Sequence, residues 1–257
     1  MHSTTSHSLS HNKILRIAVP PVFWLGVWQC AAVFVGKELL LPSPLAVAQT
    51  LLQLILTPLF WQTAGISLVR IFTGFLGGTL LGLLLGAATS ALPWADLILS
   101  PAIRVIRATP VASFILLVLL WVTTGLVPGV CAGLMVLPVV WGNVCKGISL
   151  VDPKLLELAR AYRFSGWKTL KRIYLPSVLP HFAGGCATGL GLAWKAGVAA
   201  EVLCLPRVAI GLQIFDAKRY LETPALFAWT AVVILLSFLL ENAFGLLFRR
   251  LERGRKL

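Results

Sequence analysis

The stretch DPKLLELARAYRFSGWKTLKRIYLP, residues 152–176, is a basic and amphipathic segment between two apolar runs of the chain. The flanking runs, 127–149 and 177–204, each supply the roughly 20 apolar residues that a helix needs to cross a bilayer. A segment this rich in charge is costly in hydrocarbon, so it must lie outside the membrane. Its place between two membrane helices organises the whole interpretation of the sequence.

The composition indicates that most of the chain lies in a lipid bilayer. Hydrophobic residues make up 58% of the chain and charged residues only 12%. Apolar runs cover residues 17–35, 66–92, 103–123, 127–149, 177–204 and 225–248. They predict an all-α integral membrane protein with six transmembrane helices. The net charge of +13 does not indicate nucleic-acid binding, because no soluble basic face with groove-reading elements accompanies it.

The distribution of basic residues predicts the orientation. With a cytoplasmic N-terminus, 16 Lys and Arg residues fall in cytoplasmic segments and 4 in external ones. Because basic residues concentrate in cytoplasmic loops, this bias predicts that both termini and the stretch 152–176 face the cytoplasm. The expected location is the cell inner membrane.

The ends of the chain predict further segments. Residues 1–13 are rich in Ser and His and are expected to form a disordered tail, and residues 251–257 form a basic C-terminal tail. Residues 14–61 are expected to hold an uncleaved signal-anchor helix followed by an outer interfacial segment. The main transmembrane domain is placed at 62–250. The five cysteines form no metal-binding or disulfide pattern.

Two short helices are predicted within 152–176. Asp152 followed by Pro153 is a typical helix start, and the first helix is expected to run to about residue 163. A second amphipathic helix is expected over 167–174, ended by the prolines at 176 and 180. On this pattern alone the helices suit either docking in a protein cleft or lying on lipid.

The same stretch resembles the EAA loop in the membrane subunits of binding-protein-dependent ABC importers. The E-x-A and I-x-L-P frame is matched by Glu157, Ala159, Ile173, Leu175 and Pro176. The resemblance extends over about 62–250 and is most similar to the nitrate, sulfonate and taurine branch. That similarity rests on Arg107 with Pro110, on Ser165-Gly166-Trp167, and on Trp194 ahead of Ala199-Ala200-Glu201.

The resemblance implies a type I importer permease core of the MetI-like kind. Its expected partners are cytoplasmic ABC ATPase subunits, an extracytoplasmic solute-binding protein and a second permease copy, most simply in a homodimer. ATP would be used by the partner subunit, and no cofactor, metal or catalytic residue is expected in this chain. The residues expected to couple to the ATPase are Glu157, Ala159, Tyr162, Arg163, Ser165, Gly166 and Trp167.

Two positions depart from the family pattern. Leu158 stands where the family usually has alanine, and Arg163 stands where it has a turn glycine. Gly166 follows three residues later, and glycine adopts a positive φ at little cost. Gly166 is therefore the candidate substitute for the turn glycine, and the sequence leaves open whether it takes that role.

Ionisable residues inside the spans are candidates for the translocation pathway. Lys195 and Glu201 lie in the fifth apolar run, where a charge is costly and a functional role is the default hypothesis. Trp194 shares a helix face with Glu201 and is included with them. The alternatives are a structural ion pair or snorkelling to the interface. Glu241 is expected to be structural, and Arg70 to reach the lipid headgroups.

Glycines repeat every four residues in two spans. Gly74, Gly78, Gly82 and Gly86 do so in the second, and Gly185, Gly189 and Gly197 with Ala193 in the fifth. Such stripes predict close helix crossings.

The rival function is an ion-coupled secondary transporter, which would need Lys195 and Glu201 as coupling groups and no ATPase. The lack of an inverted hydropathy repeat weakens it. The transported solute is not predicted, because anionic, neutral and cationic solutes occur in related branches.

Overall fold

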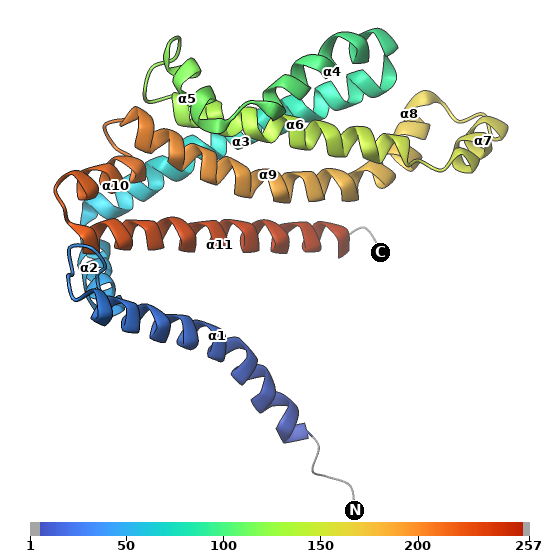
Figure 1. Cartoon of the computed structure of the whole chain (residues 1–257). Helices are drawn as coiled ribbons and strands as arrows, with labels where there is room; N and C mark the ends of the chain where they lie inside the picture. The colour runs from blue at the N-terminus through green and yellow to red at the C-terminus, as the bar shows by residue number, and fades with distance from the viewer. Residues whose placement is uncertain (1–5, 254–257) are drawn as a thin grey trace, which may run out of the picture. The chain divides into compact units, whose positions relative to one another are not determined.

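The computed structural model describes the backbone of residues 6–253 and the side chains of residues 19–246, 248 and 250. The described backbone is helical and contains no strand. Its helices, in chain order, are α1 (Ser6–Val35), α2 (Pro44–Ile55), α3 (Pro58–Ala91), α4 (Pro93–Ala108), α5 (Val111–Leu119), α6 (Val127–Ser149), α7 (Pro153–Ala161), α8 (Gly166–Thr169), η1 (Leu170–Tyr174), α9 (Leu175–Cys204), α10 (Ile210–Arg219) and α11 (Thr223–Arg253) (Figure 1). The expected all-α class is confirmed.

The chain divides into two compact units, one of which joins residues 1–60 to residues 213–231. In this unit the Trp28 indole donates a hydrogen bond to the Pro42 carbonyl at 3.0 Å and stacks on Phe227. The Thr223 hydroxyl donates to the Leu39 carbonyl at 2.6 Å. These contacts tie α1, the turn that precedes α2 and the start of α11 together.

The ends of the chain differ in part from the expected tails. Helix α1 begins at Ser6, inside the segment 1–13 that was expected to be disordered. No Gly or Pro lies between Ser6 and Val19, so nothing stops the helix from extending outward from the apolar run. At the other end α11 continues through Arg253, and residues 254–257 of the basic tail lie outside the described residues.

The second unit joins residues 61–212 to residues 232–257, and its helices α3 and α6 touch backbone to backbone. A Cβ added at Gly74 or Gly78 would overlap the backbone of Gly129 or Gly133. At Gly82 it would lie 2.8 Å from the Leu137 carbonyl oxygen. The close crossing predicted for the second span is therefore present along most of its length.

Helix α9 packs on the same α6 helix through its own small residues. A Cβ at Gly185 would lie 2.9 Å from the Cβ of Asn143, and one at Gly197 would lie 2.5 Å from Ile71 of α3. Helix α9 thus contacts both α6 and α3, and the predicted glycine stripe of the fifth span is confirmed as a packing surface.

The third apolar run, 103–123, does not form one helix. The structure has α4, which begins ten residues earlier at Pro93, and α5, and the two are bent by 107° at Thr109 and Pro110. The bend arises because a proline disfavours helical backbone in the residue before it, and Thr109 is extended with φ −75° and ψ 130°.

Three described helices are long and apolar enough to cross a membrane, namely α3, α6 and the 223–246 part of α11. A fourth span results if the bent α4–α5 pair counts as one. The six-span arrangement stays a prediction.

Candidate functional site

The segment between α6 and α9 folds as expected at its start. The Asp152 carboxylate accepts a hydrogen bond from the Lys154 amide at 2.9 Å, and Pro153 occupies the first helical position. This is the N-cap that the sequence predicted. Helix α7 then ends at Ala161, two residues before the predicted end. Figure 1 shows α7 and α8 beyond one end of the α6–α9 pair.

The turn after α7 is formed by Arg163, not by Gly166. Arg163 has φ +49°, whereas Gly166 is not among the described glycines with positive φ. The Phe164 amide donates to the Ala159 carbonyl at 2.8 Å, and the Arg163 amide donates to the Arg160 carbonyl at 3.0 Å. These two bonds are those of a Schellman motif, whose left-handed position is usually glycine.

The open question of whether Gly166 replaces the turn glycine is therefore decided against Gly166. The backbone hydrogen bonds after Ala159 and Arg160 require the left-handed residue at position 163, and no later residue can satisfy them. Arginine accepts this conformation at a cost of about 1–2 kcal/mol. Gly166 instead opens α8, where the Ser165 hydroxyl caps the Lys168 amide at 3.3 Å.

The second predicted helix does not end at Pro176. Helix α8 passes into the π-helical turn η1 and then into α9, with helical backbone at the junction residues Leu170, Tyr174 and Leu175. In this wider turn the Leu175 amide donates to the Leu170 carbonyl, five residues back, which is the π-helical pattern. Residues 166–204 therefore form one continuous helical path from the loop to the end of α9.

A small core holds this loop together. Val151, Ala159 and Ile173 are buried, and Phe164 packs on them. Two residues of the recognised frame, Ala159 and Ile173, thus have a structural role. By contrast, Glu157 is exposed, and so are the remaining residues expected to contact the ATPase, Tyr162, Arg163, Ser165, Gly166 and Trp167.

The exposed face of the loop carries large aromatic side chains. Tyr162 is 70% exposed and Trp167 is 73% exposed, with basic residues around them. Trp and Tyr are enriched at the centres of protein interfaces, where they supply contact area at low entropic cost. The loop therefore combines a packed interior with an outer surface that exposes two large aromatic rings among basic residues.

At the other end of α9, Glu201 is held in a closed network. Its side chain is fully buried and forms an ion pair with Arg70 of α3 at 2.9 Å. It also accepts hydrogen bonds from the Ser67 hydroxyl at 2.9 Å and from the Gly211 amide at 3.1 Å. Arg70 additionally donates to the Val208 carbonyl at 3.3 Å. Of the two alternatives for Glu201, the structure contains the ion pair.

The other two pathway candidates lie in different surroundings. Trp194 is buried and donates its indole hydrogen to the Val233 carbonyl at 2.9 Å. Lys195 is exposed and lines a cavity of about 410 Å³ with Glu241. The structure therefore places the two ionisable candidates in different surroundings, with Lys195 exposed and Glu201 buried in an ion pair with Arg70. A pathway role for Lys195 stays a prediction.

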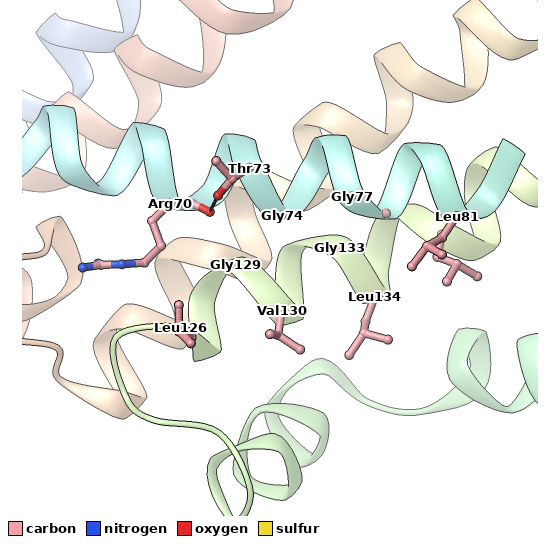
Figure 2. A pocket seen from close by; sticks show the side chains of 12 residues that line it. Arg70, Thr73, Gly74, Gly77, Leu81, Leu126, Gly129, Val130, Gly133 and Leu134 are labelled. Atoms are coloured by element: carbon pink, nitrogen blue, oxygen red, sulfur yellow. Dashed lines mark hydrogen bonds between the residues drawn. The ribbon is translucent and has the colours of Figure 1, made fainter. Parts of the chain in front are cut away.

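The groove beside the α3–α6 crossing is mainly apolar. Figure 2 shows Gly74, Gly77, Gly129 and Gly133 along its floor, with Arg70 at one end. Its volume is about 420 Å³, and the other residues lining it are Thr73, Gly78, Leu81, Leu126, Val130, Leu134 and Leu137. The one charged group of the groove is already paired with Glu201.

Sequence reasoning missed the role of Arg70. It was expected to reach the headgroups, but its side chain is only 16% exposed and is bound to Glu201. A usable signal was present, because a buried carboxylate in a span needs a cation, and Arg70 lies toward the same predicted membrane face as Glu201.

Comparisons with known proteins agree with this geometry. Residues 78–253 match the family described as "Binding-protein-dependent transport system inner membrane component". The chain is 32% identical to a putative aliphatic sulfonates transport permease protein of Escherichia coli, over 93% of this chain and 91% of that protein. It is 28% identical to the taurine transport system permease protein of the same organism, over 95% and 90% of the two chains.

A riboflavin transport system permease protein of Chloroflexus aurantiacus is 30% identical, with 93% of this chain and 90% of that protein covered. Among solved structures, an amino acid ABC transporter chain has a TM-score of 0.61 at 19% identity, covering 77% of this chain and 94% of its own length. That likeness supports the importer fold alone. The chain is therefore a multi-pass inner-membrane permease subunit of the binding-protein-dependent ABC importers, in the branch that includes the sulfonate, taurine and nitrate permeases.

Proposed function

We propose that this chain forms the translocation pathway for a small solute and is driven by a cytoplasmic ATPase that docks on residues 152–176. The solute is delivered by an extracytoplasmic binding protein, and two copies of the chain form the pathway as a homodimer. Both termini face the cytoplasm. ATP is hydrolysed by the partner subunit and not by this chain.

The exposed aromatic surface of the loop is the observation that carries this proposal. Tyr162 and Trp167 stand out from a loop whose own core is already filled by Val151, Ala159 and Ile173. Because the loop needs neither aromatic ring for its own packing, their contact area is free for a partner. Glu157, which is exposed on α7, adds a charge that can specify the docking register.

The continuous helix 166–204 supports a mechanical role for the loop. A movement of α8 is passed through η1 to α9, because no flexible link separates them. Helix α9 in turn packs on α6 and α3 through glycines with little room for adjustment. When ATP closes the ATPase subunits, the packed helices are therefore expected to move together as rigid bodies. Such rigid-body movements are one way in which a protein switches between two states.

Two loop variants test the docking. Gly166→Leu places a side chain where nothing lies within 4 Å and where φ is not positive, so the chain itself has room for it. Glu157→Lys reverses an exposed charge. We expect each to lower retention of the co-expressed ATPase subunit during purification by about tenfold, as a loss of roughly 1.4 kcal/mol implies.

Glu222→Lys is the matched control for charge reversal, since Glu222 is also exposed but lies between α10 and α11. It should retain the ATPase fully. Uptake by reconstituted vesicles should fall with ATPase retention in the loop variants. A wild-type chain that never retains an ATPase subunit would contradict the proposed function.

A further inference from the structure

A further cavity, of about 570 Å³, lies among α4, α6 and α9 and is called here the α4–α6–α9 cavity. Its walls include the apolar side chains of Ile106, Met135, Pro138, Val139 and Leu192. The volume falls in the range of small-molecule sites, about 300–1,000 Å³. Unlike the apolar groove beside α3, this cavity also carries a set of polar side chains.

Four polar side chains line the α4–α6–α9 cavity, and all of them can donate hydrogen bonds: Arg107, Asn143, Lys146 and Thr188. Asn143 and Lys146 lie three residues apart and so share one face of α6. The Asn143 amide uses one hydrogen on the Val139 carbonyl at 2.9 Å and retains the other. No carboxylate is among the residues that line this cavity.

The two cations of the cavity are unpaired within the described part of the chain. Neither the Arg107 guanidinium nor the Lys146 ammonium has an ion-pair or hydrogen-bond partner among the described residues. A basic residue near a helix C-terminus is common, because it opposes the helix dipole. Helix ends do not explain why two such residues meet in one cavity without an acid.

The cavity that holds Lys195 and Glu241 adjoins the α4–α6–α9 cavity. Thr188 and Leu192 border both of them. A third cation, Lys195, therefore lies in the neighbouring cavity, where it is accompanied by the Glu241 carboxylate. Arg107 and Lys146 have no such acid beside them in the α4–α6–α9 cavity.

We propose that the α4–α6–α9 cavity is a binding station for a small organic anion, with an oxyanion head at Arg107 and Lys146. A short apolar tail lies against Met135, Val139 and Leu192. Arginine suits such a head because its planar fork bonds two oxygens at once. Both cations are exposed, which keeps binding weak enough for a transported solute to leave. This inference rests on the proposed transport function and assigns the class of solute.

The test uses the permease–ATPase complex in nanodiscs of zwitterionic lipid and a fluorinated probe, 4,4,4-trifluorobutane-1-sulfonate, observed by ¹⁹F NMR line broadening. The neutral 4,4,4-trifluorobutan-1-ol is the matched probe. We expect the sulfonate to bind to the wild-type complex at least tenfold more tightly than the alcohol, as one charge-assisted hydrogen bond implies.

Three variants locate the site. The double variant Arg107→Gln, Lys146→Gln should weaken sulfonate binding by at least tenfold. Gly142→Leu should do the same by filling the cavity, because Gly142 lines it and a Cβ there meets no atom within 4 Å. Arg104→Gln removes an exposed charge on the same helix α4 that does not line the cavity, and it should leave binding unchanged.

The proposal is overturned if every variant binds the sulfonate as tightly as the wild-type complex does. It is also overturned if the wild-type complex binds the alcohol as tightly as the sulfonate. A lipid phosphate is the other source of an oxyanion head, so a second set of nanodiscs contains phosphatidylglycerol. Enrichment of that lipid by the wild-type but not the double variant, without sulfonate binding, overturns the assignment to solute. Retention of the ATPase by every variant separates these outcomes from a failure of the docking proposal.

Discussion

The Arg70–Glu201 ion pair and the two cations Arg107 and Lys146 place charged groups in opposite surroundings. Glu201 is fully buried and accepts bonds from Arg70, Ser67 and Gly211, so its charge is fully used inside the protein. Arg107 and Lys146 are exposed to a cavity and have no partner among the described residues. In this structure, therefore, the Glu201 charge is already bonded within the protein, whereas the Arg107 and Lys146 side chains keep their hydrogen-bond donors free.

Glu201→Ala should have the largest effect on the closed pair. It leaves the Arg70 guanidinium unpaired at a largely buried site and removes the acceptor of the Ser67 and Gly211 bonds. Breaking a buried pair costs about 3–5 kcal/mol. We expect most of the protein to be lost from the monodisperse peak on detergent size-exclusion chromatography.

The double variant Arg70→Met, Glu201→Leu is the control for this loss. It removes both charges, so no buried ion remains unpaired, and much of the folded protein should return. Undiminished stability of Glu201→Ala alone would show that the closed pair is not structural.

Gly78→Ala tests whether the stability of the region around Arg70 and Glu201 depends on the close contact between α3 and α6. The added Cβ overlaps the backbone of Gly133, which cannot move aside as a flexible side chain would. Overpacking of this kind costs about 1–3 kcal/mol. Thermal unfolding in detergent should show the loss. Gly77→Ala is the neighbouring control, since its Cβ meets nothing within 4 Å, and a similar loss there would contradict the helix-contact explanation.

Arg163→Gly tests the cost of a left-handed backbone at a residue other than glycine. It relieves the left-handed backbone at φ +49° and should stabilise the loop by about 1 kcal/mol. The melting temperature should rise by about 2–4 °C if the loop unfolds with the rest of the chain. Arg160→Gly, in the last turn of α7 just before Arg163, should lower it instead, because glycine in a helix costs up to about 1 kcal/mol.

Lys146→Gln should have the smallest effect on stability. Its ammonium group has no partner among the described residues, so the change should stay within about 0.5 kcal/mol. Chemical unfolding of the variant beside the wild-type chain measures this. A loss of stability as large as that of Glu201→Ala would contradict the distinction between the buried Arg70–Glu201 ion pair and the unpaired cations Arg107 and Lys146.

Local patterns predicted much of the fold. Helix α6 has the bounds of its apolar run, 127–149, and the Asp152–Pro153 cap starts α7 as expected. These features depend on neighbouring residues, which a sequence displays directly. The bend at Thr109 was missed although Pro110 was visible, because a continuous apolar run was given more weight than the proline.

The candidate site was predicted less completely. The E-x-A frame located the loop, but only the backbone hydrogen bonds to Ala159 and Arg160 show that Arg163 forms the turn. Glu201 was recognised as unusual, yet its partner lies 131 residues away in α3. Periodicity within a helix reports which residues share a face, but it does not report which helix that face meets.

The class of protein, the position of the loop 152–176 and the glycine faces along which α3 and α9 pack were all readable from the sequence alone. These follow from composition, capping chemistry and residue spacing, all of which act over a few turns of helix. Only the tertiary structure shows which charged side chains are paired and which are not, because the partners lie on helices that are far apart in the sequence. It closed Arg70 onto Glu201 and left Arg107 and Lys146 open to a shared cavity.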